Sequence, residues 1–121
     1  MISSALSAQD WQISFETTRM KQYEDVEPQL VHLKDQQVAS IRTKAEFSDG
    51  KHSITVQYLR CTHGQWEWAF KSQIGFLPDG KISGQTITDD SKLKWAAFDP
   101  PTNKLDLLRL ERASKLLGVK K

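Results

Sequence analysis

Apolar and polar residues alternate along residues 52–70, and this alternation predicts a β-hairpin in the middle of the chain. Two alternating runs flank Thr62-His63-Gly64, Ile54-Val56-Tyr58 before it and Trp66-Trp68-Phe70 after it. Because successive side chains of a strand point to opposite faces of a sheet, each run presents its apolar residues on one face. We expect the rest of the fold to be organised around this hairpin.

The length of the turn decides whether the two apolar runs share a face, because a slip of one residue inverts every side chain. A turn of two residues pairs Arg60 with Glu67, which is attractive but separates the runs. A loop of three residues pairs Tyr58 with Trp68 and places Gly64 where a positive φ is required. One cross-strand charge pair contributes less than about 1 kcal/mol, whereas burying each aromatic side chain contributes roughly 1.5–3 kcal/mol. The three-residue loop is therefore predicted.

Residues 38–47 alternate in the same way and are followed by Asp49-Gly50, a strong signal for a two-residue hairpin turn. One face of this strand carries Ile41, Thr43, Ala45 and Phe47, and the other carries Ser40, Arg42, Lys44 and Glu46. The two-residue turn pairs Ala45 with Ile54 and Thr43 with Val56. Both hairpins then agree on one buried face, and this agreement supports the assignment.

The flanking segments add further strands with less distinct patterns. After Phe70 the strand continues to a tight turn at residues 78–80, and another strand runs from Ile82 to about Ile87. Residues 11–19 fit a strand better than a helix capped by Ser7, because several of them are β-branched. Residues 21–36 are locally acidic, and we expect an irregular segment or a short helix. Pro28 could open such a helix or could mark an extended crossing.

A C-terminal helix is predicted to begin at Thr102 or Asn103 and to end before Gly118. Its apolar stripe, interrupted by Asp106 and Arg109, consists of Leu105, Leu108, Ala113, Leu116 and Leu117. The expected fold is α+β: an antiparallel meander sheet of four to five strands packed against this helix. Residues 1–121 form one domain, with residues 1–8 frayed and residues 118–121 as a flexible tail.

Composition narrows the classes of protein that fit. The chain is 38% hydrophobic and 26% charged, which is ordinary for a globular domain, and its net charge of +2 is too small to indicate nucleic-acid binding. Cys61 is the single cysteine, so an internal disulfide is excluded and a reducing compartment is favoured. No signal peptide and no membrane span are read from the pattern, so a cytoplasmic location is expected.

No set of residues indicates catalysis, a cofactor or a metal. Cys61 and His63 could form a nucleophile and a base, but a third orienting group and an oxyanion site are lacking. The three histidines have no metal-ligand spacing. Asp89-Asp90 and Asp99 are expected to cap turns or helices. A non-enzymatic protein without a cofactor is therefore predicted, and an enzyme whose site the sequence does not mark is the last alternative.

Macromolecular binding is the function that remains, with another protein as the expected partner in an inhibitor, adaptor or accessory role. The candidate binding residues are Arg42, Lys44, Gln57, Lys71, Arg109, Arg112 and Lys115. The first four are placed with Thr55 and Gln73 on the polar sheet face, and the last three belong to the basic C-terminal segment. Contacts to phosphates make nucleic-acid binding the alternative, and a plain solvated sheet face is the simpler interpretation. An exposed sheet edge could also pair with a second copy of the chain.

Overall fold

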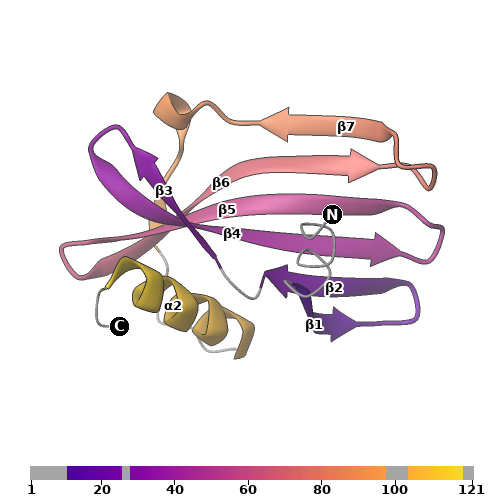
Figure 1. Ribbon diagram of the computed structural model, residues 1–121, viewed down its shortest axis with the longest axis horizontal. Coiled ribbons are helices and arrows are strands. Elements are labelled where there is room, and N and C mark those ends of the chain that lie inside the picture. Colours follow the sequence, from indigo (N-terminus) through magenta and orange to yellow (C-terminus); the bar gives the residue numbers. More distant parts are fainter. Residues whose placement is uncertain (1–10, 26–27, 98–103, 119–121) are drawn as a thin grey trace, which may run out of the picture.

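The computed structural model describes residues 11–25, 28–97 and 104–118, and its main element is one antiparallel sheet of eight strands (Figure 1). The strands are β1 (Trp11–Glu16), β2 (Met20–Asp25), β3 (Gln29–Leu33), β4 (Gln36–Phe47), β5 (His52–Thr62), β6 (Gln65–Phe76), β7 (Ile82–Ile87) and β8 (Ala96–Ala97). Their order is β1-β2-β4-β5-β6-β7, with β3 also paired to β4 and β8 also paired to β6. A 3-10 turn, η1 (Asp90–Lys92), precedes β8, and the helix α2 (Lys104–Leu117) follows it.

The predicted α+β class, the meander and the C-terminal helix are confirmed, but the sheet has more strands than expected. Residues 11–16 form a strand, as predicted. Residues 21–36 do not form an irregular segment or a helix, because β2 and β3 both lie in this region. The sequence pattern did not indicate β2, because the residues that this strand turns toward α2 are polar. Gln22 and Glu24 lie on the side of the sheet that packs against α2. Residues 1–8, residues 119–121 and the predicted helix start at 102–103 lie outside the described residues.

The turn between β5 and β6 contains two residues, so the predicted three-residue loop is wrong. Thr62 pairs with Gln65, and both His63 and Gly64 have positive φ, 52° and 79°. Two central residues with positive φ match the right-handed twist of the flanking strands. A β-bulge further along the hairpin explains why the packing argument failed. Gln57 pairs with Phe70 and Val56 with Ser72, so one extra residue of β6 changes the faces halfway along the strand.

The turn between β4 and β5 is one residue longer than the predicted two-residue turn. The amide of Phe47 donates to the carbonyl of Lys51 at 2.8 Å, which leaves a loop of three residues, Ser48, Asp49 and Gly50. Gly50 has φ +92° and takes the left-handed position of this loop. The register therefore pairs Lys44, and not Ala45, with Ile54. The predicted agreement of the two hairpins on one buried face was wrong, because both turns slipped by one residue.

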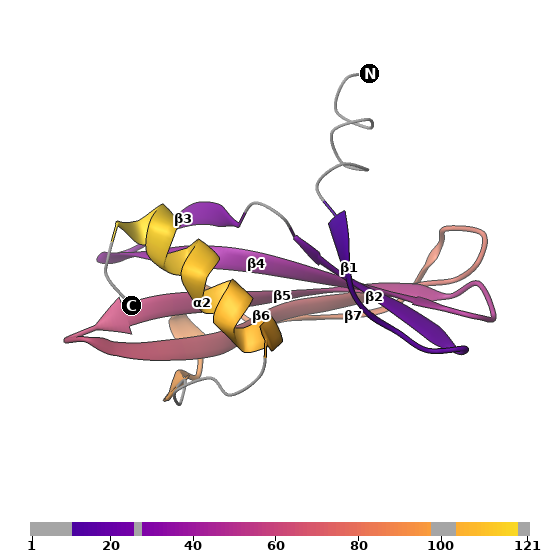
Figure 2. The ribbon, with the colours of Figure 1, turned by 90° about the horizontal axis from the view of Figure 1, so that it is seen from below.

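The core lies between α2 and one half of one sheet face, called here the helix face (Figure 2). Its buried residues are Ala39, Ile41, Leu59 and Trp66 from the sheet and Leu110 and Ala113 from α2, with Cys61, Trp68, Leu116 and Leu117 packed around them. Trp66 lies in this core and Trp68 packs against it, so both tryptophans lie on the face that α2 covers. Tyr58, which was expected in the same cluster, lies on the opposite face because it pairs with Ser40 and Ala69. The side chain of Leu105 is outside the described part of the structure.

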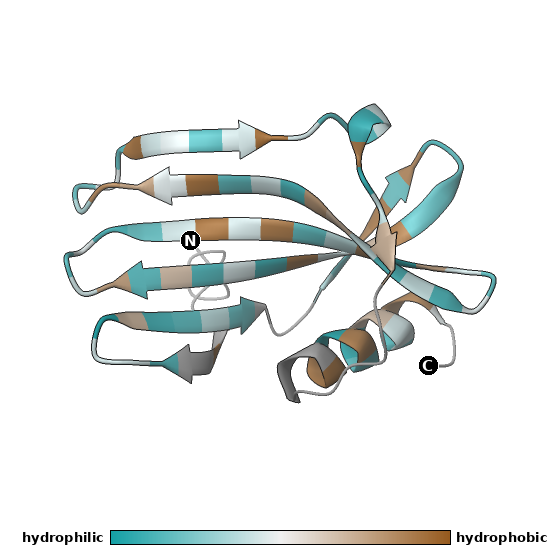
Figure 3. Cartoon of the chain, turned by 180° about the vertical axis from the view of Figure 1, so that it is seen from behind, coloured by the Kyte–Doolittle hydropathy of each residue, from teal (hydrophilic) through white to brown (hydrophobic). Residues whose placement is uncertain are grey.

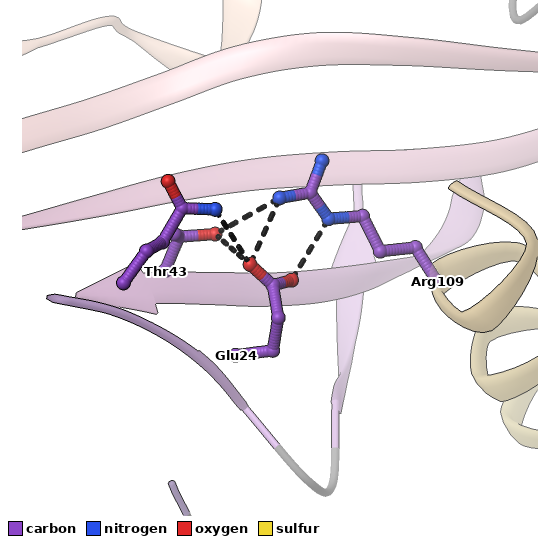
Figure 4. Close-up of polar contacts among 4 residues, drawn as sticks. Glu24, Thr43 and Arg109 are labelled. Atoms are coloured by element: carbon purple, nitrogen blue, oxygen red, sulfur yellow. Dashed lines mark hydrogen bonds and ion pairs between the residues drawn. The ribbon is translucent and has the colours of Figure 1, made fainter. Parts of the chain in front are cut away.

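A buried ion pair joins α2 to β2 (Figure 4). The Nε of Arg109 lies 2.8 Å from Oε1 of Glu24, and a second guanidinium nitrogen lies 2.9 Å from Oε2. The Glu24 side chain is only 2% exposed, and the hydroxyl of Thr43 also donates to it at 3.3 Å. Arg109 was predicted to interrupt the apolar stripe of the helix; the structure shows that it points to the sheet and fixes the position of the helix there.

Candidate protein-binding surface

The predicted binding residues do not lie on one surface. Arg42 and Lys44 belong to the sheet face opposite α2, called here the open face, where they pair with Val56 and Ile54. Gln57 pairs with Ile41 and Phe70 and therefore lies on the helix face. Thr55 lies on the helix face as well, because it is two residues from Gln57 on the same strand. Gln73 pairs with Thr55 and therefore lies on that face too. The prediction that these polar residues share a face with Arg42 and Lys44 was wrong, because it depended on the two turn lengths.

Lys44 lies in a small polar cluster on the open face. Its Nζ is 3.5 Å from Oε2 of Glu46 and 4.8 Å from the centre of the Tyr23 ring. The hydroxyl of Tyr23 donates to Oε1 of Glu46 at 3.0 Å. This hydrogen bond to a carboxylate favours the neutral phenol and, together with burial, raises the pKa of Tyr23. The positive charge of Lys44 is thus balanced by a neighbouring carboxylate.

Lys71 is held within the molecule. It is the extra residue of the bulge in β6, and its Nζ donates to the carbonyl of Thr88 at 2.7 Å and to Oδ1 of Asp90 at 2.6 Å. The same nitrogen lies 5.9 Å from the centre of the Tyr58 ring. Lys71 therefore ties β6 to the segment that follows β7. Asp89, beside it, caps η1 by accepting hydrogen bonds from Ser91, as predicted, and these bonds lower its pKa.

The three helix residues of the predicted set are separated in the same way. Arg109 is committed to Glu24, Arg112 is half-buried, and Lys115 is exposed. Arg109 contacts Glu24 and Thr43 on the helix face, whereas Arg42 and Lys44 lie on the open face. The seven predicted residues are thus spread over both sheet faces and the helix.

The half of the open face that lies behind α2 is covered by the segment between β7 and β8. Trp95 stacks on Arg60, whose guanidinium carbon is 3.9 Å from the centre of the indole ring. The Nε of Arg60 donates to Oε1 of Glu67 at 2.8 Å, which is the pair that a two-residue turn predicts. Arg60 thus stacks on Trp95 and forms an ion pair with Glu67, and these contacts hold the segment with Trp95 against the open face.

In the other half of the open face the strands carry hydrophobic residues (Figure 3), and no helix or strand of the described residues lies over this half (Figure 2). The register arranges these side chains in three rows that cross β4, β5, β6 and β7. The rows are Glu46-His52-Phe76-Ile82, Lys44-Ile54-Ile74-Gln85 and Arg42-Val56-Ser72-Ile87. We call Ile54, Val56, Ile74, Phe76, Ile82 and Ile87 the open patch.

The edge of the open patch is the most exposed part of it. Ile82 and Ile87 are 57% and 58% exposed, whereas most large apolar residues of the described chain are half-buried or buried. His52 and Phe76 stack with ring centres 4.6 Å apart, which holds one row rigid. The sequence pattern did identify these residues as apolar and alternating, but the wrong register assigned Ile54 and Val56 to the core.

Other kinds of site find little support in the described residues. Cys61 packs against the core beneath α2, whereas His63 lies in the turn between β5 and β6. Among the described residues no group of three or more His, Cys, Asp or Glu side chains is placed to hold a metal ion. No helix in the described ranges has the length and apolar character needed to cross a membrane.

Comparison with known proteins found no family model, no curated protein and no solved structure that matches this chain.

Proposed function

We propose that this chain is a non-catalytic binding protein and that it binds another protein on the open patch. The observation that carries the proposal is the group of exposed and half-buried apolar side chains on the half of a sheet face that no helix or strand of the described residues covers, with Ile82 and Ile87 more than half exposed. Large uncovered apolar patches on globular proteins mark interaction sites. An inhibitor, adaptor or accessory subunit is the corresponding role.

The distribution of polar residues over the same strands supports this proposal. In the far half of the sheet the helix face carries Ser53, Thr55, Gln73 and Thr86, which are suited to contact with water. The open face of the same strands carries the isoleucines and Phe76. An antiparallel sheet with one solvated face normally buries the other face against a second layer. A protein partner would supply that layer.

The charges beside the patch favour protein over nucleic acid. The β4 end of the three rows carries Arg42, Lys44 and Glu46, and the amine of Lys44 is already 3.5 Å from the Glu46 carboxylate. Nucleic-acid binding depends on cations that replace the counterions of phosphates. A surface whose centre is aliphatic and whose margin has mixed charge fits a protein with an apolar contact and a polar rim.

The test is site-specific photo-crosslinking in the native host. A photoreactive phenylalanine at Ile82 or Ile87 is expected to give one discrete crosslinked protein, and serine at the other of these two positions is expected to remove it. Leu107 provides a matched control, since it is 47% exposed but belongs to α2. A probe at Leu107 should not give the same product. Equal crosslinking from Leu107 and Ile82, or none from either patch position, would contradict the proposal.

A further inference from the structure

The strand β7 is an edge of the sheet with only one of the features that usually protect an edge, a bulge at Ser83 near its start. Its single strand neighbour among the described residues is β6, and all six of its residues are exposed. Its sequence, Ile-Ser-Gly-Gln-Thr-Ile, contains no charged residue and no proline. Natural proteins protect such edges with lysines, prolines or bulges, because the unpaired backbone groups can bind another strand. The opposite edge, β1, has both a glutamate and a bulge.

The backbone direction along β7 follows from one hydrogen bond at its end. The amide of Thr88 donates to the carbonyl of Lys71 at 2.8 Å, so the backbone groups of residue 88 point toward β6. In an antiparallel pair, N–H and C=O groups point toward and away from the neighbouring strand in alternation. The N–H and C=O groups of Ile87 and Gln85 therefore point away from β6, and those of Thr86 point toward it. Ile87 and Gln85 also have their side chains on the open face.

We propose that the protein partner contributes an extended segment that adds to the sheet as a new strand beside β7. This inference rests on the proposed function and names the form of the partner. The outward backbone groups of Gln85 and Ile87 would bond to that segment. Partner residues opposite these two would point to the open face, where Ile82 and Ile87 offer apolar contacts. We therefore expect the bound segment to have apolar residues at alternate positions.

A second copy of this chain fits the edge less well than a free segment does. Symmetric pairing centred on Gln85 places Ile87 opposite Ser83 of the second copy, and Ser83 is the unpaired residue of a bulge. Symmetric pairing centred on Thr86 brings η1 opposite the start of β7, and η1 is not extended. Lys71 holds η1 in place through Asp90. A free segment carries neither irregularity of its own, so it can follow the regular part of β7 from Gly84 to Ile87.

The first experiment measures amide hydrogen exchange of the wild-type protein. The probes are peptides selected from a phage-displayed library of random dodecapeptides on the immobilised protein. We expect enriched peptides with apolar residues at alternate positions. Their binding should slow exchange at Gln85 and Ile87 at least tenfold and change Thr86 little, because β6 already protects that amide. Bound peptides that leave Gln85 and Ile87 exchanging rapidly, or the enrichment of no peptide, would overturn the inference.

The second experiment removes one outward donor. Gln85→Pro deletes an N–H that points away from β6, and proline is tolerated at such edge positions. The affinity for the selected peptides should fall at least tenfold, and Thr86→Ser, which keeps every outward N–H, should change it less than twofold. If Gln85→Pro does not fold, the exchange measurement on the wild-type protein decides alone.

The outcomes separate this inference from the proposed function. Peptides whose binding is lost in Ile82→Ser but kept in Gln85→Pro would overturn strand addition and leave the open patch as the binding surface. Peptides that bind equally to both variants would contradict both proposals. A dimer in sedimentation of the protein alone, abolished by Gln85→Pro, would assign the edge to a second copy and overturn the choice of partner.

Discussion

Replacing Arg109 should show how much the buried ion pair between α2 and β2 contributes to the free energy of unfolding. Arg109→Met keeps most of the aliphatic stem but deletes the guanidinium that lies 2.8 and 2.9 Å from the two carboxylate oxygens of Glu24. The Glu24 side chain is 2% exposed, so the carboxylate would stay buried. Hydrogen bonds from Thr43 and Gln22, both at 3.3 Å, would remain but carry no positive charge.

Breaking a buried pair by deleting one partner costs about 3–5 kcal/mol, because the other charge is left uncompensated. For a domain of this size that corresponds to a fall of roughly 10–20 °C in the melting temperature. Denaturation in urea should show the same loss as a lower midpoint with an unchanged slope.

Two further variants make this prediction decisive. Lys115→Met alters an exposed residue of the same helix, and its stability should remain within about 0.5 kcal/mol of the wild type. Glu24→Gln combined with Arg109→Met removes the stranded charge, so the double variant should be more stable than Arg109→Met alone. A cost below about 1 kcal/mol for Arg109→Met would refute the reasoning, since such a value is typical of exposed ion pairs.

Three other changes have defined outcomes. His63→Asn should raise the free energy of unfolding by a few tenths to about 1 kcal/mol, because φ is +52° at this position and asparagine tolerates the left-handed region better than histidine; an unchanged or lower stability in urea would argue against strain in the turn. Trp66→Ala should destabilise the fold by about 3–5 kcal/mol, as expected for a core tryptophan that is 7% exposed, and a loss under 1 kcal/mol would contradict its assignment to the core. Glu46→Gln should lower the pKa of Tyr23 toward its ordinary value in an ultraviolet titration, since the variant no longer holds the phenol neutral through a carboxylate.

The strands of the central sheet could be predicted from alternation, but the faces of those strands could not. The residue ranges of β4, β5, β6 and β7 agree closely with the pattern, because alternation over six or more residues is a strong signal. The face depends on the turn length, and Asp49-Gly50 and His63-Gly64 each fit loops of two or three residues. Both choices were wrong by one residue. Together they placed β5 on the wrong face, whereas Trp66 and Trp68 of β6 still share the face of Ile41, as predicted.

The bulge in β6 is the second reason for the difference. The energetic comparison assumed that all the aromatic side chains of the hairpin had to share one face. With Lys71 as an extra residue, Trp66 and Trp68 lie on the helix face while Ile74 and Phe76 lie on the open face. No local property of the sequence marks this position, since a bulge is selected by the packing of both faces.

The burial of Glu24 could not be predicted either, because its partner lies far away in the chain. A run of acidic residues at 24–35 is typical of a solvated segment, and only the docking of α2 makes a buried carboxylate favourable. The apolar residues of the open patch were visible in the sequence. Their exposure was not, because it follows from the register.

The contact between Glu24 and Arg109 joins residues that are 85 positions apart, and this separation affects how the chain folds during synthesis. The strands of the sheet are made before α2, so the part of the helix face with Ala39, Leu59 and Trp66 lacks the cover of α2 until that helix has been synthesised. Folds dominated by such distant contacts form in milliseconds to seconds. Before α2 packs on the sheet, we expect the nascent chain to expose apolar residues on both sheet faces. Such exposure makes the nascent chain a substrate for chaperones.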